Sequence, residues 1–232
     1  MTVEAPRPRI SRYGEESWLV AFDAPLGLDV NARVHALAAE IRRRVLPGVR
    51  DIVPAATSLV VHADADLFDG GALEEAAAVV PGHSSPARPP RLHEIPVCYD
   101  PPFAPDLEDV ARACGCAEAT VVERHLACQY QVLMLGFLPG FPYLGLVDER
   151  IAAPRKATPR RDVPAGSVGI AGRQTGIYPC QSPGGWQIIG RTPCAMFDPG
   201  RPAPARLAPG DRVRFVRIDA ARVRETDPFA GW

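Results

Sequence analysis

Charged side chains gather in a proline-punctuated loop within a segment, residues 135–193, that is unusually rich in glycine and proline. Arg155, Lys156, Arg160 and Arg161 place four cations within seven residues of this loop. Arginine binds planar anions through parallel hydrogen bonds, so these side chains are suited to hold a carboxylate or a phosphate. A solvated loop without any ligand is the alternative, and the spacing does not separate the two.

A second group of polar side chains follows, set between tight turns. Its members offer amide, hydroxyl and guanidinium groups, which suit a small polar ligand when an apolar wall lies beside them. They are Gln174, Thr175, Tyr178, Ser182, Gln187 and Arg191, with Trp186 as the wall. A single tryptophan is also typical of an ordinary buried core, so the pocket is a hypothesis.

His125 stands shortly before an apolar segment and the glycine-rich turn at residues 136–140. Its imidazole titrates near neutral pH, which suits a general base or a hydrogen-bonding partner in a pocket. The alternative is a structural histidine at the end of a helix. The other four histidines form no closely spaced pair, and we expect no metal site.

Composition describes an ordinary globular protein. The 232 residues carry a net charge of −1, which gives no electrostatic reason to expect nucleic acid or a membrane as a partner. No run approaches the ~20 apolar residues of a membrane span, and residues 1–10 lack the apolar core of a signal peptide. The six cysteines form no CxxC pair, which favours free thiols. We therefore expect a cytoplasmic protein.

Hydrophobic periodicity before residue 100 predicts alternating strands and helices. The expected strands are residues 9–13, 18–22, 49–53, 58–62 and 91–99, and the expected helices are residues 30–45 and 67–80. Counted from Trp18, the order is β-α-β-β-α-β, which is the split pattern of ferredoxin-like domains.

Residues 81–90 contain four prolines and two serines, which is typical of a linker. We therefore expect two domains, residues 1–90 and 91–232. The second opens with two short helices, one capped by Asp106 and one near residues 118–126. The rest is mainly β, with short strands between specified turns.

Long motifs in the glycine-rich segment resemble a known family. They are Gly136-Phe-Leu-Pro-Gly-Phe-Pro-Tyr-Leu-Gly145, Pro154-Arg-Lys-Ala-Thr-Pro-Arg160, Val163-Pro-Ala-Gly-Ser-Val-Gly-Ile-Ala-Gly172, Gln174-Thr-Gly-Ile-Tyr-Pro179 and Ser182-Pro-Gly-Gly-Trp-Gln-Ile-Ile-Gly-Arg-Thr-Pro193. This pattern is similar to the KipI family, whose members are called the 5-oxoprolinase B subunit or allophanate hydrolase subunit 1. The resemblance covers nearly the whole chain and is strongest after residue 125.

The resemblance implies an α+β protein, with an N-terminal ferredoxin-like α/β domain followed by a cyclophilin-like β-barrel domain. It also implies one component of a bacterial ATP-dependent 5-oxoprolinase, working with the A and C subunits on a small cyclic amide, 5-oxo-L-proline. The complex opens that lactam to L-glutamate. The sequence has no Gly-Lys-Ser/Thr phosphate loop, so we expect the partners to carry part of the ATP site.

Within that reading, our hypothesis gives catalytic roles to His125 and Arg191. Substrate-binding roles go to Arg160, Gln174, Tyr178, Ser182 and Trp186. Two alternatives stay open: a binding module that inhibits a sensor histidine kinase, and a component of an enzyme for allophanate or another small amide. One departure from the family is Cys180, which replaces an aliphatic residue and is expected to be a buried, inert thiol.

Overall fold

The computed structural model describes residues 7–80 and 89–231 and divides the chain into two compact units, Met1–Pro90 and Arg91–Trp232. Residues 81–88, most of the predicted linker, lie outside the described residues, as do residues 1–6 of the segment tested for a signal peptide. No helix among the described residues is long and apolar enough to span a bilayer.

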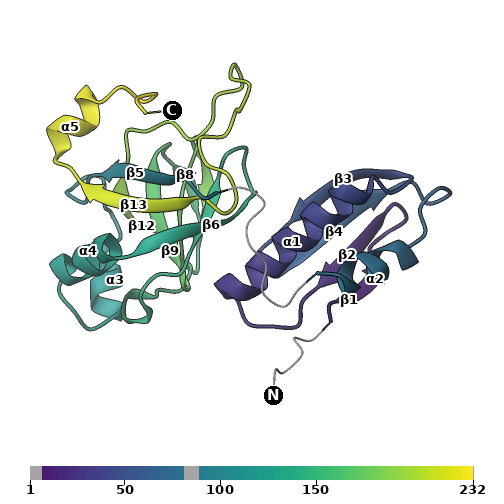
Figure 1. The fold of residues 1–232 in the computed structure, drawn as a ribbon. Coiled ribbons are helices and arrows are strands. Elements are labelled where there is room, and N and C mark those ends of the chain that lie inside the picture. The colour runs from purple at the N-terminus through teal and green to yellow at the C-terminus, as the bar shows by residue number, and fades with distance from the viewer. Residues whose placement is uncertain (1–6, 81–88, 232) are drawn as a thin grey trace. The chain divides into compact units, whose positions relative to one another are not determined.

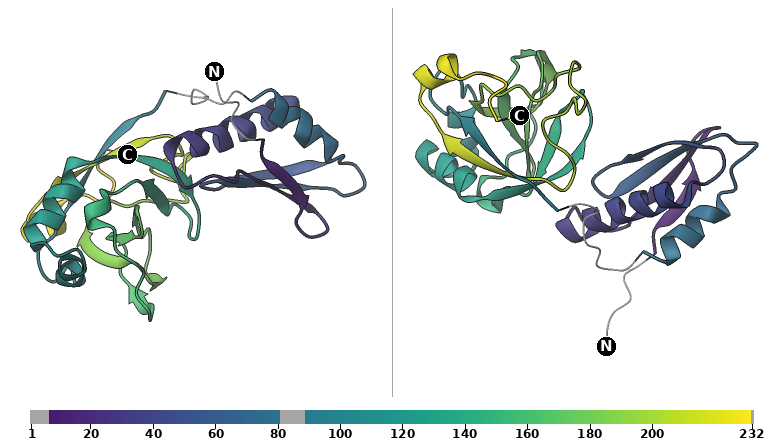
Figure 2. Two further views of the ribbon diagram at one scale, coloured as in Figure 1. Left: turned by 90° about the horizontal axis from the view of Figure 1, so that it is seen from below. Right: turned by 45° about the horizontal axis from the view of Figure 1, so that its top comes forward.

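The first unit is a four-stranded antiparallel sheet with two helices on one face (Figures 1 and 2). Its strand order is β1-β2-β4-β3. The elements are β1 Arg9–Arg12, β2 Ser17–Ala21, α1 Leu28–Arg44, β3 Val49–Pro54, β4 Ser58–Ala63 and α2 Gly71–Ala78.

Helix α1 forms because apolar residues recur on one of its faces, as the periodicity predicts. Val34, Leu37 and Ile41 are at most 1% exposed and pack against the sheet. The helix ends at Val45, whose backbone is left-handed with φ 49°. The three arginines of its last turn lie where the helix dipole favours cations.

The predicted split pattern is wrong in its last strand. The segment at residues 91–99 does form a strand, β5 Leu92–Val97, but β5 belongs to the sheet of the second unit. The N-terminal strand β1 pairs with β2 instead and takes the fourth place in the first sheet. Local periodicity predicts that a strand forms, but the choice of partner depends on contacts distant in sequence.

The second unit is built on a curled sheet of seven strands, in the order β12-β9-β10-β7-β6-β13-β5. A separate pair joins β8 Arg160–Val163 to β11 Ser182–Gly184. The seven strands are β5, β6 Gln129–Leu135, β7 Pro142–Gly145, β9 Ser167–Ala171, β10 Gln174–Ile177, β12 Gln187–Arg191 and β13 Arg212–Arg217. The helices are α3 Leu107–Ala113, α4 Glu118–Ala127, the short 3₁₀ helix Glu149–Ile151 and α5 Ala220–Glu225.

Strand β13 lies between β5 and β6 in this sheet (Figure 1). It runs parallel to β5 and antiparallel to β6. The first and last strands of the unit are therefore direct neighbours.

The two faces of the sheet carry different layers of side chains. On β10, Thr175 and Ile177 are buried on the side covered by α3 and α4, where the larger core lies. Gly176 and Tyr178 alternate with them and face the other side. At Gly176, a Cβ atom would come within 3.0 Å of the Phe141 ring, so glycine is needed for the ring to lie on the sheet.

Candidate functional site

Five aromatic rings cover the glycine-bearing face of the sheet. We call them the aromatic layer: Phe137, Phe141, Tyr143, Tyr178 and Trp186. Phe141 lies at the centre, with ring centroids 5.2 Å from Tyr178 and 5.5 Å from Trp186, both edge to face. Such pairs are favourable beyond their buried area. Phe141, Tyr178 and Trp186 are at most 5% exposed and form a buried core cluster, which favours the core alternative for Trp186. Of the five rings, only Phe137 and the half-buried Tyr143 reach the surface, where a small ligand can contact them.

Phe137 differs from the other rings because it is 61% exposed. Its backbone is left-handed, with φ 67°, a conformation that non-glycine residues rarely adopt. It sits in the turn between β6 and β7, where Leu138 N–H bonds to Gly136 O at 2.8 Å. The turn therefore holds an aromatic ring at the open edge of the layer.

Tyr178 presents its hydroxyl at the β11 end of the layer. The Tyr178 side chain is only 1% exposed, so this hydroxyl is enclosed by the surrounding chain. Burial raises the pKa of Tyr178, so the group is a neutral donor at physiological pH. A Cβ atom on Gly184 would overlap this hydroxyl, so the approach of β11 to Tyr178 requires glycine.

Three buried polar atoms in this half of the unit have no hydrogen-bond partner among the described residues. They are Gln174 Nε2, Ser182 Oγ and Gln187 Oε1. Gln174 lies on the same face of β10 as Tyr178, four residues earlier. Unsatisfied buried polar atoms are costly, and a bound ligand is one way to satisfy them.

The strongest polar contact of the unit centres on Asp106, which is 1% exposed. Its carboxylate accepts Arg160 Nη1 and Nη2 at 2.6 and 2.5 Å and Lys156 Nζ at 2.8 Å. It also accepts the Ile188 N–H at 2.7 Å. Burial alone would raise the pKa of Asp106, but the bonds from Arg160 and Lys156 outweigh burial and hold the pKa below its ordinary value. We call this group the Asp106 clamp.

The sequence pattern predicts only a capping role for Asp106 and does not predict the clamp. Asp106 does stand at the N-cap of α3, but its side chain makes no capping bond. The clamp changes the prediction for the basic loop, because Lys156 and Arg160 already share the carboxylate of Asp106, and Lys156 Nζ also lies 3.9 Å from Asp109. The acid next to the cluster in sequence, Asp162, accepts from Gln181 instead, so sequence proximity does not identify the partner.

Arg191, at the end of β12, is half-buried, and its Nε donates to Ala165 O at 3.0 Å. It lies beside Gly166, where a Cβ atom would fall 2.2 Å from Thr192 O. Arg191 thus holds the turn at residues 164–166, whose Gly166 N–H bonds to Tyr178 O at 2.8 Å. The structure links Arg191 to Tyr178 through this turn.

His125 is fully buried in the larger core, stacked on Phe215 at 4.6 Å. Its Nε2 lies 3.0 Å from Thr175 Oγ1, which donates to Gly169 O, so we assign the ring proton to Nε2. Its Nδ1 then accepts from the Tyr99 hydroxyl at 2.8 Å. Burial lowers the pKa of His125 to about 3. These surroundings favour the structural alternative over a proton carrier, and the catalytic role remains a prediction.

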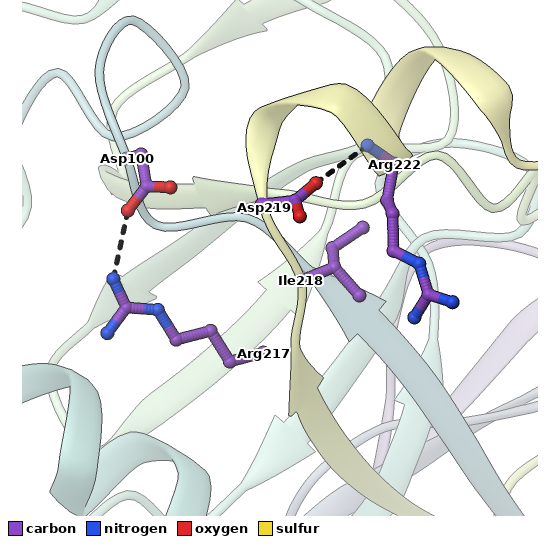
Figure 3. A pocket seen from close by; sticks show the side chains of 5 residues that line it. All are labelled: Asp100, Arg217, Ile218, Asp219 and Arg222. Atoms are coloured by element: carbon purple, nitrogen blue, oxygen red, sulfur yellow. Dashed lines mark hydrogen bonds and ion pairs between the residues drawn. The ribbon is translucent and has the colours of Figure 1, made fainter.

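A separate shallow cavity of about 450 Å³ is lined by five residues, none of which belongs to the aromatic layer (Figure 3). The residues are Asp100, Arg217, Ile218, Asp219 and Arg222. Arg217 is paired with Asp100 at 2.9 Å, and Asp219 caps α5 through the Arg222 N–H. One ion pair and one helix cap thus engage the side chains of Asp100, Arg217 and Asp219, and we assign the cavity no ligand.

The prediction for Cys180 is wrong, because its thiol is exposed rather than buried. Cys180 follows the buried Tyr178 and precedes β11, in a bend that turns its side chain outward. All six cysteines of the chain are free.

Known proteins similar to this chain share both its sequence and its fold. The family described as carboxyltransferase domain, subdomains C and D, matches residues 8–207. The 5-oxoprolinase B subunit of Bacillus subtilis (strain 168) is 43% identical over 226 residues, which cover 91% of this chain and 93% of that protein. This chain belongs to the family of 5-oxoprolinase B subunits. The resemblance carried by the glycine-rich motifs is thereby confirmed.

Two further relatives extend this result. The 5-oxoprolinase B subunit of Escherichia coli O157:H7 is 41% identical and covers 90% of this chain and 96% of its own length. The crystal structure of TTHA0988 superposes with a TM-score of 0.76 at 39% identity. It covers 88% of this chain, whereas this chain spans 40% of TTHA0988. The family fold therefore also occurs as one part of a longer polypeptide.

Proposed function

We propose that this chain is the B subunit of an ATP-dependent 5-oxoprolinase, which opens 5-oxo-L-proline to L-glutamate. The observation that carries the proposal is the 43% identity to a 5-oxoprolinase B subunit over 93% of the length of that protein. The A and C subunits are the proposed partners. ATP is used by the complex, and we place most of its binding site on those partners because this chain lacks a phosphate loop.

The reaction sets a clear chemical demand. An unstrained amide is a poor electrophile, and phosphorylation of the lactam oxygen by ATP makes the ring carbon open to attack by water. Fixed donors near the ring are then needed to hold the charge that develops. In this chain, the part of the aromatic layer that reaches the surface supplies a wall for the apolar ring, and the Tyr143 hydroxyl supplies a neutral donor.

The proposed binding residues divide into two groups by their surroundings. Gln174 and Ser182 carry unpartnered buried atoms and stay as proposed contacts to the substrate, with Trp186 packed behind the surface rings of the wall. Arg160 is held by Asp106, so we propose that it shapes the site rather than binds the ligand. Arg191 positions the turn that contacts Tyr178, and we propose a role in turnover through that turn.

We also propose the finer fold names as working descriptions. The first sheet keeps the four-strand arrangement of a ferredoxin-like domain, with β1 in place of the strand expected after α2. The curled seven-stranded sheet supports a relationship of the second unit to cyclophilin-like barrels. The proposed domain limits are residues 1–90 and 91–232.

The proposal is tested by glutamate production from 5-oxoproline and ATP with the purified proteins. We expect glutamate when this chain is mixed with the A and C subunits, and none when this chain is left out. Equal activity without this chain would exclude an enzymatic role for it. An inactive full mixture would favour another small amide as substrate.

Replacing Arg191 by alanine is expected to lower turnover at least tenfold in the reconstituted complex, because the turn at residues 164–166 loses its side-chain support. The substitution removes one charge-assisted hydrogen bond, from Arg191 Nε to Ala165 O, which contributes roughly 1.5–3 kcal/mol. The variant should keep the thermal midpoint within a few degrees. Full activity of Arg191→Ala would contradict its role.

A further inference from the structure

Two arginines of the basic group, Arg155 and Arg161, lie outside the Asp106 clamp, and Arg155 is the one whose neighbours are bonded to the chain around Trp186. Lys156 and Arg160 both bind Asp106, as described above. Arg155 is exposed, and no acidic side chain pairs with it among residues 7–80 and 89–231. A guanidinium in this condition is free to bind an anion from solution.

The backbone on both sides of Arg155 is fixed against the chain around Trp186. Pro154 O accepts Gln187 Nε2 at 3.1 Å, and the Lys156 N–H donates to Gly185 O at 2.8 Å. Arg155 is thus tethered between two contacts that flank Trp186 in sequence. The backbone at Arg155 cannot move away from the aromatic layer unless these two hydrogen bonds break.

The charge of Arg155 acts on two hydroxyls of that layer. Burial raises the pKa of both Tyr143 and Tyr178, and the nearby Arg155 guanidinium partly opposes this in each case. The geometry agrees, because the backbone beside Arg155 is bonded to the residues on both sides of Trp186, and the ring centroid of Tyr143 lies 5.7 Å from that of Trp186. A cation and a half-buried phenol group therefore lie close together at the edge of the aromatic layer. This combination matches a small ring that carries a single carboxylate.

We propose that Arg155 binds the carboxylate of a small lactam acid, with the ring lying against the part of the aromatic layer that reaches the surface and with the Tyr143 hydroxyl as a further donor. The inference rests on the proposed function, since 5-oxoproline is such an acid. It deepens that function by stating how the site selects its substrate. A lactam without the carboxylate, such as 2-pyrrolidinone, loses the contact to Arg155.

The experiment compares Arg155→Gln with Arg161→Gln in the complex with the A and C subunits. Arg161 is a matched control because it is an exposed arginine of the same basic group, six residues further on in β8. We expect Arg155→Gln to raise the KM for 5-oxoproline about tenfold or more, as the loss of a charge-assisted bond implies. The KM for ATP and both constants of Arg161→Gln should change less than about twofold. Arg155→Lys keeps the charge but not the planar guanidinium that binds a carboxylate through two parallel hydrogen bonds. Its KM for 5-oxoproline should therefore lie between those of the wild type and Arg155→Gln.

An unchanged KM for 5-oxoproline in Arg155→Gln overturns the inference while leaving the proposed function intact. A rise in the KM for ATP alone also overturns it, since Arg155 would then serve the nucleotide. If the wild-type mixture makes no glutamate, the proposed function fails, and binding to this chain decides the inference. In that case 5-oxo-L-proline should shift the NMR signals of the Trp186 indole in the wild type and not in Arg155→Gln. No shift in either protein would overturn it.

Discussion

Replacing Asp106 by asparagine is expected to lower the free energy of unfolding of the second unit by about 3–5 kcal/mol, the range found when one partner of a buried ion pair is removed. The carboxylate compensates Arg160 and Lys156, whose side chains are 28% and 25% exposed, and it accepts the Ile188 N–H. Asparagine keeps the shape but leaves Arg160 without its acidic partner and Lys156 with only Asp109, at 3.9 Å. The thermal midpoint and the hydrogen exchange rate of the Ile188 amide measure the loss.

The matched control is Glu108→Gln, in α3. Glu108 is 75% exposed and pairs with Arg112 at 2.7 Å. Exposed pairs of this kind contribute little, so the control should change stability by less than about 1 kcal/mol. Equal effects of the two substitutions would show that the clamp does not stabilise the fold.

The clamp also has a pH dependence of defined sign. The folded pKa of Asp106 is below its ordinary value, so the unfolded chain takes up the proton first as the solution is acidified. The stabilisation that the ionised Asp106 gives to the folded state is fully present above the ordinary pKa of about 4, and it is lost as the pH falls through the lower pKa of the folded state. Asp106→Asn should remove this acid-dependent component.

The second large expected effect is a loss of stability caused by His125, which begins at a higher pH than the loss caused by Asp106. Burial lowers the folded pKa of His125 from 6.5 to about 3. Below pH 6.5 the unfolded chain binds a proton that the folded chain excludes, so stability falls with decreasing pH until about pH 3. The slope is about 1.4 kcal/mol per pH unit, or roughly 2 kcal/mol between pH 6.5 and 5. Urea unfolding at a series of pH values measures it.

Two variants separate this effect from that of other histidines. His125→Gln should be less stable at pH 7 by about 1–3 kcal/mol, because the Tyr99 hydroxyl loses its partner, and its slope between pH 6.5 and 5 should be smaller. His62→Gln changes an exposed histidine of the first unit and should keep the slope of the wild type. If His125→Gln retains the full slope, another group causes it. Normal turnover in His125→Gln would, in addition, remove its proposed catalytic role.

Local sequence patterns predicted the elements better than their partners. Helix α4, expected near residues 118–126, is found at Glu118–Ala127, because helical spacing of apolar residues is a local property. Strand β5 was expected at the right place but assigned to the wrong sheet. Strand pairing depends on which distant strand completes the core. Local hydrophobic periodicity carries no information about that partner.

The candidate site shows the same division. The glycine-rich motifs identified the segment that carries the aromatic layer, since turn glycines and rings alternate along it. These motifs do not reveal that the Arg160 side chain is bound by a carboxylate, because its partner Asp106 lies 54 residues earlier in sequence. The basic loop was thus predicted as a set of equivalent cations, whereas the structure separates Arg155 from Lys156 and Arg160.

The position of β13 between β5 and β6 has a consequence for synthesis of the chain on the ribosome. The ion pair between Glu94 and Arg214 joins residues 120 positions apart, and β13 is the only sheet strand hydrogen-bonded to β5 among the described residues. During translation, β5 therefore emerges early and stays unpaired until residues 212–217 have been made. An unpaired apolar strand is prone to associate with other chains. Nascent forms of this unit that stop before β13 are thus the ones expected to need a chaperone.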